Sequence, residues 1–148
     1  MKKTKFFPSP GEEKIFSQES LEAEELGKSL GILLWEHRGG DVIALDLRGE
    51  NTWTDFFVIA TATSGAHLAG LERQVREFCG EKGIDILRVS PRSKGISEDE
   101  WLVIDLGALV IHLMTGKIRE FYELERLWDT AGVLFRSPPA ASLGRASP

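Results

Sequence analysis

Two apolar runs, Trp101–Leu106 and Ala108–Met114, are separated by a single glycine, and this spacing constrains the fold more than any other feature of the chain. Each run has the length of a β-strand. A connection this short leaves no room for the crossover that parallel neighbours need, so the two runs must form an antiparallel hairpin. A two-residue turn at Leu106-Gly107 or at Gly107-Ala108 puts the same side chains on each face, whereas a three-residue turn would flip one strand.

The two faces of this hairpin differ in character. Because side chains alternate along a strand, one face is purely aliphatic and belongs to the core. That face carries Leu102, Ile104, Leu109, Ile111 and Leu113. The other face mixes a tryptophan, an acid and a histidine with apolar neighbours, and with a Leu106-Gly107 turn Trp101 faces His112.

This polar-aromatic face, together with the helix expected from about Gly116, is the candidate functional surface. A hairpin and a helix need none of these polar residues in order to fold. The residues that we predict to bind a partner are Trp101, Asp105, His112, Arg119, Tyr122 and Glu123. The competing interpretation is that Trp101 belongs to the core and packs under the last helix.

The rest of the chain predicts a single α/β domain. One helix begins at Ser20, which can cap it, and stops at Gly39-Gly40. A second helix runs from Ala66 to about Lys82 and has Ser64 as its cap. Three further strands are predicted at residues 42–47, 56–62 and 86–89, and strand 56–62 has the continuous apolar character of a strand covered on both faces. We expect a mixed β-sheet of about five strands flanked by helices.

We place this domain at residues 18–135, between a flexible N-terminal arm (1–17) and a disordered C-terminal tail (136–148). The arm mixes Lys, Pro and Gly without a period, and the tail is rich in Ser, Pro, Ala and Gly. Cys79 is the only cysteine and cannot form an internal disulfide, which is typical of a reducing compartment. No run approaches the roughly 20 apolar residues of a membrane span. We therefore expect a cytoplasmic protein that makes no membrane contact.

The charge of the chain indicates the kind of partner. A protein that binds nucleic acid through phosphates has a basic surface, but this chain has a net charge of -5. An acidic surface is better suited to a basic protein. We predict no direct sequence-specific binding of nucleic acid.

The residues of the hairpin do not favour a catalytic site or a metal site. His112 and Asp105 could form an acid–base pair, but no Ser or Cys nucleophile lies near them in the sequence. A metal ion would need further ligands, and His37 and His67 lie on other elements without ligand spacing.

Two other segments are candidate sites. Residues 61–64 precede a helix, so their amides could bind an anion, but the lysine and glycines of a phosphate loop are missing and helix capping is the favoured role. Asp41, Asp46 and Asp55 are not placed as the paired carboxylates of a magnesium-dependent transferase. We therefore predict no catalytic residue, no cofactor and no metal, and a protein that is not an enzyme.

Four segments together resemble the ribosomal silencing factor family, the Iojap-like proteins. They are residues 55–64, 101–107, 110–112 and 119–128, within a match that covers about residues 20–130. The resemblance implies a nucleotidyltransferase-like topology without transferase activity. It also implies binding to the large ribosomal subunit through a basic ribosomal protein on its joining face, so that the small subunit cannot dock and translation falls under nutrient shortage.

The chain departs from the family pattern at Phe56, at Ala62 and Ala66, and at Ala108. The second departure puts a ribosome or anion contact near Thr63-Ser64 in doubt, and the third removes an acid beside Asp105. Alternative functions are a large-subunit assembly factor, another cytosolic protein-interaction module, or a nucleotidyltransferase-type enzyme. A homodimer of the free chain is also left open.

Overall fold

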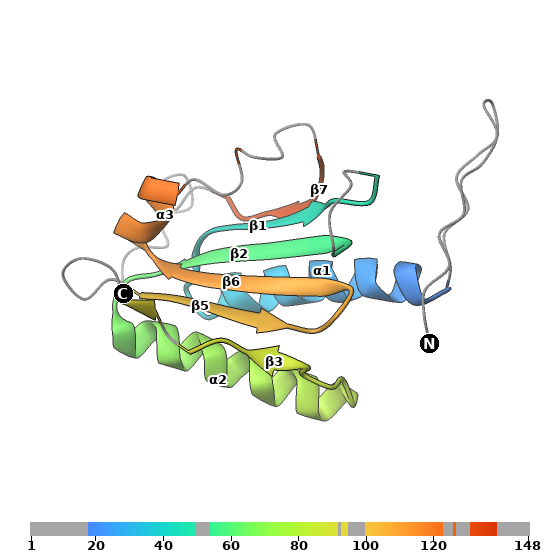
Figure 1. The fold of residues 1–148 in the computed structure, drawn as a ribbon, viewed down its shortest axis with the longest axis horizontal. Coiled ribbons are helices and arrows are strands. Elements are labelled where there is room, and N and C mark those ends of the chain that lie inside the picture. The colour runs from blue at the N-terminus through green and yellow to red at the C-terminus, as the bar shows by residue number, and fades with distance from the viewer. Residues whose placement is uncertain are drawn as a thin grey trace.

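The computed structural model describes residues 18–49, 54–91, 93–94, 100–122, 126 and 131–138. The expected N-terminal arm, most of the expected tail and the second half of the closing helix lie outside these residues. The elements follow the order α1 (Gln18–Glu36), β1 (Gly40–Asp46), β2 (Phe56–Ala62), α2 (Gly65–Lys82), β3 (Arg88–Val89), β4 (Ser93–Lys94), β5 (Glu100–Asp105), β6 (Leu109–Thr115), α3 (Gly116–Tyr122) and β7 (Gly132–Arg136). Figure 1 shows α3 at one end of the sheet, and the β5–β6 turn and the start of α1 at the other.

The strands form one mixed sheet along the path β3-β5-β6-β2-β1-β7, and β4 pairs with β5. The two central strands, β2 and β6, are parallel, with Phe56 opposite Leu109 and Ala62 opposite Thr115. The other pairings are antiparallel. The predicted α/β class, the mixed sheet and the hairpin are confirmed, whereas β4 and β7 were not predicted.

Hydrophobic side chains pack on both faces of the sheet. Phe56 and Val58 of β2 face a first layer, which α1 and α2 cover with residues such as Leu30 and Leu71. The alternate residues of β2 face a second layer on the opposite side. That second layer consists of Ile43, Leu45, Leu47, Phe57, Ile59, Val110, Met114 and Ile118. The expectation that β2 is covered on both faces is therefore confirmed.

The two long helices differ in how well their ends were predicted. The side chain of Ser64 caps α2 by accepting from the N–H of His67, and Gly83 ends the helix with a φ of 70°, as expected. In contrast, Ser20 does not cap α1, because the helix already includes Gln18 and the Ser20 side chain is buried. The left-handed residue after α1 is Arg38 rather than a glycine.

Gly39 still has a physical reason to follow α1. Its N–H donates to the carbonyl of Leu34 at 2.7 Å. A Cβ at position 39 would lie 2.8 Å from that same oxygen, so a side chain there would force the backbone apart. The glycine allows a close approach, and positive φ is not its role here.

Strand β7 extends past residue 135, the expected end of the domain. It pairs with β1, with Phe135 opposite Ala44, and its last residue is Arg136. The Ser137 hydroxyl accepts from the N–H of Val42 at 3.0 Å, while the Ser137 N–H donates to the Val42 carbonyl at 2.9 Å. Residue 136, which we expected to begin the disordered tail, therefore belongs to the sheet, and residue 137 bonds to β1 directly after it.

Candidate functional site

The register of the β5–β6 hairpin decides which residues of the polar-aromatic face meet. Asp105 pairs with Val110, and the Leu106 N–H donates to the Leu109 carbonyl at 2.9 Å. The turn is therefore Gly107-Ala108, and the Leu106-Gly107 turn is wrong. The reason is conformational: the first residue of such a turn needs a positive φ, which Gly107 supplies at 97° and a leucine resists.

The shift moves the pairing by two residues and so keeps the predicted faces. Trp101 now lies opposite Met114, and His112 lies opposite Val103. Trp101 and His112 are diagonal neighbours on the same face. The indole Nε1–H donates to His112 Nδ1 at 3.1 Å, and the two ring centroids are 6.0 Å apart. Phe57 of β2 meets the imidazole edge-on, with a centroid distance of 4.7 Å.

Burial makes His112 a neutral histidine. Its residue is only 7% exposed, and this desolvation lowers the pKa of the imidazole to about 4. An indole N–H can only donate, so Nδ1 is the acceptor and the proton lies on Nε2. Nε2 is buried, and no polar group of the described residues bonds to it.

Asp105 does not pair with His112. Its Oδ1 accepts from the N–H of Gly107 at 2.8 Å, which secures the start of the turn. Its Oδ2 lies 3.9 Å from a guanidinium nitrogen of Arg88, whose side chain is largely exposed. The His112–Asp105 acid–base pair weighed from the sequence is therefore not assembled, because each group bonds to a different partner.

Arg119 lies inside the molecule. It is 8% exposed, and its guanidinium donates to Thr61 Oγ1 at 2.9 Å and to the Gly40 carbonyl at 3.4 Å. Arg119 thus connects α3 to the ends of β1 and β2. Tyr122 is the last residue of α3, but its side chain and all of Glu123 lie outside what the structure describes.

Trp101 is half-buried. This is intermediate between the exposed partner-binding residue and the core residue that the sequence left as alternatives. Its ring packs at the border of the second hydrophobic layer, beside Val103. It is therefore neither a free surface side chain nor a fully enclosed core residue. Its partial exposure leaves indole surface on the face of β5 that also carries Asp105, four residues further along the strand.

The segment before α2 has the capping role that was favoured. The Ser64 hydroxyl accepts from the His67 N–H at 3.1 Å, and His67 Nδ1 accepts from the Thr63 N–H at 2.9 Å. Among the described residues, no three His, Cys, Asp or Glu side chains gather as they would to hold a metal ion. Within the same part of the chain, no helix has the length and apolar character to cross a membrane.

The sequence interpretation missed a polar cluster around Arg48. Its guanidinium contacts Asp46 at 2.6 Å and Glu24 at 2.8 Å, and it stacks 4.8 Å from the Phe56 ring centroid. The hydrogen bond to Asp46 raises the pKa of Arg48, although burial opposes that shift. The cluster joins α1 to the end of β1, and an Asp two residues before the Arg was the available signal.

Comparisons with known proteins agree with the resemblance in the sequence. Residues 20–145 match the family described as "Ribosomal silencing factor during starvation". The ribosomal silencing factor of Treponema pallidum is 35% identical over 96 residues, which are 65% of this chain and 83% of that protein. A mouse protein named mitochondrial assembly of ribosomal large subunit protein 1 is 38% identical over 99 residues, 65% of this chain and 42% of its own length. A crystal structure from Chromobacterium violaceum has a TM-score of 0.59 at 25% identity and covers 73% of this chain and 85% of that one.

Proposed function

Because this chain belongs to the ribosomal silencing factor family, we propose that it binds the large ribosomal subunit and keeps the small subunit from joining it. Translation would then fall under nutrient shortage, and the protein would act in the cytoplasm, where ribosomes work. The observation that carries the proposal is the family match over residues 20–145, which includes the whole polar-aromatic face. Blocking a joining surface requires occupancy and no chemical step, so we propose no enzymatic activity.

We propose that the contact is centred on Trp101 and Asp105. Trp101 offers a large aromatic surface, and its bond to His112 restricts the indole before binding, which lowers the entropy cost of association. Among the residues that the structure describes, Asp105 Oδ2 pairs only with the largely exposed guanidinium of Arg88 at 3.9 Å, so it can accept from a cationic side chain of a partner. With the net charge of -5, this favours a basic ribosomal protein as the partner.

The other predicted site residues have different roles in this proposal. His112 and Arg119 are buried and would support the surface from beneath, by orienting Trp101 and holding α3. We propose that Tyr122, the last residue of α3, and Glu123 after it extend the contact. Their contribution is tested by substitution in the same binding assay.

Co-sedimentation with separated ribosomal subunits tests the function. We expect the chain to travel with the large subunit and not with the small one, and to reduce the fraction of joined ribosomes. Trp101→Ala should weaken large-subunit binding by about tenfold or more, which corresponds to about 1.4 kcal/mol. Ile32→Ala removes an exposed apolar side chain from α1, away from this face, and should bind like the unchanged chain. Normal joining in the presence of saturating protein would exclude the proposed function.

A second candidate function is assembly of the large subunit, and the name of the similar mouse protein favours it. The two functions separate experimentally. Depletion of an assembly factor causes incomplete large subunits to accumulate during growth, whereas depletion of a silencing factor leaves their composition normal and raises translation under starvation.

A further inference from the structure

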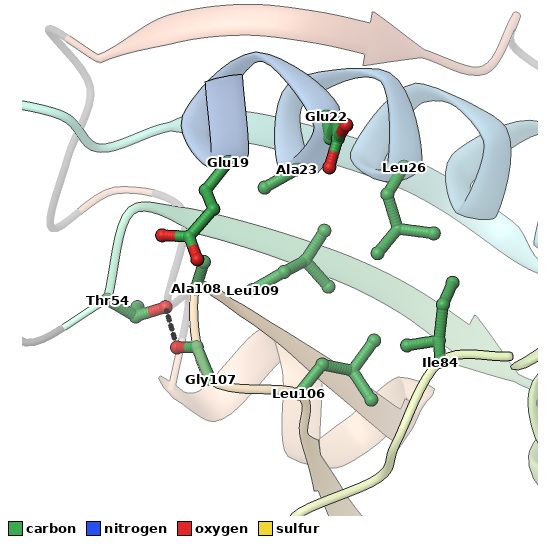
Figure 2. Close-up of a pocket in the computed structure, with 10 residues that line it drawn as sticks. All are labelled: Glu19, Glu22, Ala23, Leu26, Thr54, Ile84, Leu106, Gly107, Ala108 and Leu109. Atoms are coloured by element: carbon green, nitrogen blue, oxygen red, sulfur yellow. Dashed lines mark hydrogen bonds between the residues drawn. The ribbon is translucent and has the colours of Figure 1, made fainter. Parts of the chain in front are cut away.

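A pocket lies at the end of the domain that carries the hairpin turn. It has a volume of about 580 Å³ and is open between the first two turns of α1, the turn of the β5–β6 hairpin and the segment after α2. Figure 2 shows Leu26, Ile84, Leu106 and Leu109 pointing toward one another across it. Thr54 closes one side, where its hydroxyl donates to the Gly107 carbonyl at 3.2 Å.

The lining of this pocket combines an apolar floor with an acidic rim. The aliphatic side chains and Ala23 form the floor, and Glu19 and Glu22 of α1 stand at the rim. Within the described part of the chain, no cation lies within 4.0 Å of either rim carboxylate. The neighbouring acids differ, because Glu24 and Glu25 both pair with Lys28. The pocket therefore suits a ligand with positive charges next to a large apolar group.

We propose that residues 2–7 of the same chain bind in this pocket. Their sequence, Lys-Lys-Thr-Lys-Phe-Phe, places three cations directly before two phenylalanines. The lysines would meet Glu19 and Glu22, and one phenyl ring would lie between Leu26 and Leu106. A buried aromatic ring removes a large apolar area from water, and the charge pairs select the orientation.

The residues that connect this segment to α1 are numerous enough for it to reach the pocket. Residues 8–17 separate the segment from Gln18, and ten residues can span up to about 33–36 Å. The acceptor glutamates lie in the first two turns of the helix, within about 10 Å of its start along the axis. Pro8, Pro10 and Gly11 are residues that favour chain reversal. The tether also makes the encounter intramolecular, with an effective concentration in the millimolar range.

This pocket is separate from the proposed ribosome contact. Leu109 points to the first hydrophobic layer, whereas Trp101 and Asp105 are on the opposite face of the hairpin. Occupancy of the pocket therefore does not require release of the ribosome-binding face. It would stabilise the end of the sheet where α1 meets the hairpin turn.

A spin label on the segment tests the proposal in the full chain. The nitroxide is attached at Thr4→Cys; the native Cys79 is 1% exposed and burial raises the pKa of its thiol, so the label reacts with the introduced cysteine. Amide NMR signals of Ile84, Leu106 and Ala108 should be lost in the oxidised sample and return on reduction. Glu19→Gln with Glu22→Gln should restore these signals, and so should Phe6→Ser with Phe7→Ser.

The control is Glu36→Gln, at the opposite end of the same helix, which should leave the signal loss unchanged. If the pocket signals persist in the oxidised sample, or are lost equally in the Gln and Ser variants, the proposal is overturned. A sample that mixes spin-labelled chains without ¹⁵N and ¹⁵N chains without a label reports contacts between molecules. Signal loss in that mixture would assign the pocket to a second copy and would also overturn the proposal.

Discussion

The hydrogen bond from Trp101 Nε1 to His112 Nδ1 requires that the histidine remain neutral. Protonation would place a second donor on Nδ1, facing the indole N–H, and the bond would be lost. The orientation of a half-buried tryptophan is thereby coupled to the ionisation of a buried ring. Burial, which holds the pKa of His112 at about 4, keeps the pair intact near neutral pH.

The stability of the fold should decrease in mild acid. The pKa of His112 is about 4 in the folded chain, below the value of about 6.5 in the unfolded chain. The neutral ring therefore contributes its full stability above pH 6.5, and this contribution is lost as the pH falls toward 4. The loss should reach about 3 kcal/mol in the free energy of unfolding, measured with urea at a series of pH values.

Two substitutions separate His112 from the other titrating groups. His112→Asn keeps an acceptor for the Trp101 N–H but cannot be protonated, so the stability lost between pH 6.5 and 4 should shrink. His37→Gln changes an exposed histidine and should leave the pH dependence as it was. An unchanged slope in the Asn variant would show that His112 does not cause it.

Trp101→Phe should separate packing from hydrogen bonding. Phenylalanine keeps an aromatic ring at the border of the second hydrophobic layer but lacks the N–H, so the buried Nδ1 of His112 loses its partner. We expect a loss of about 1–3 kcal/mol in the free energy of unfolding. Ile32→Ala, on exposed α1 surface, should change stability by no more than about 0.5 kcal/mol. A Phe variant as stable as the unchanged chain would mean that the bond is weak.

Arg119→Met should loosen α3. The substitution removes the donors to Thr61 and to the Gly40 carbonyl but retains an apolar stem of similar length. Hydrogen exchange at the amides of Glu120, Phe121 and Tyr122, whose acceptors are carbonyls one turn earlier in α3, should become faster, while exchange in α2 stays unchanged. Lys117→Met, on the exposed side of the same helix, is the matched control and should have no effect. If hydrogen exchange in α3 became equally faster in both variants, Arg119 would not be the residue that holds α3 in place.

Asp105→Asn should reveal an electrostatic contact with the ribosome. Asparagine can still accept from the Gly107 N–H, so the turn should persist, but the charge that would attract a basic partner is gone. Large-subunit binding should weaken and also become less sensitive to salt, because one screened charge pair is removed. Asp85→Asn, at an exposed position after α2, should preserve both affinity and salt dependence.

The apolar pattern of the sequence was sufficient to predict the main elements. Strand β2 was predicted with its observed bounds, and both faces of the hairpin were correct, because alternation depends only on the period of the strand. The position of the hairpin turn was not resolved, since both candidate turns satisfy that alternation. Only the conformational demand on Gly107 separates them.

The burial of the polar site residues could not be predicted in the same way. An arginine within a short helix normally indicates a solvent-exposed face, and Arg119 is buried only because Thr61 and Gly40 supply acceptors from distant strands. His112 is likewise buried through neighbours on β2 and β5. Strand β7 was missed because its five residues lack alternation and gain their stability from pairing with β1.

The parallel pairing of β2 with β6 has a consequence for how the chain is made. Thr54 bonds to Gly107 across 53 residues, and Val42 bonds to Ser137 across 95. Contacts between such distant segments slow folding, and synthesis proceeds from the N-terminus. During translation, the apolar strand β2 is synthesised before β6, the strand with which it pairs in parallel. The outer edge of β1 remains unpaired until β7 has been made. A chain proposed to silence ribosomes thus cannot complete its own sheet until its ribosome has made residues 132–136.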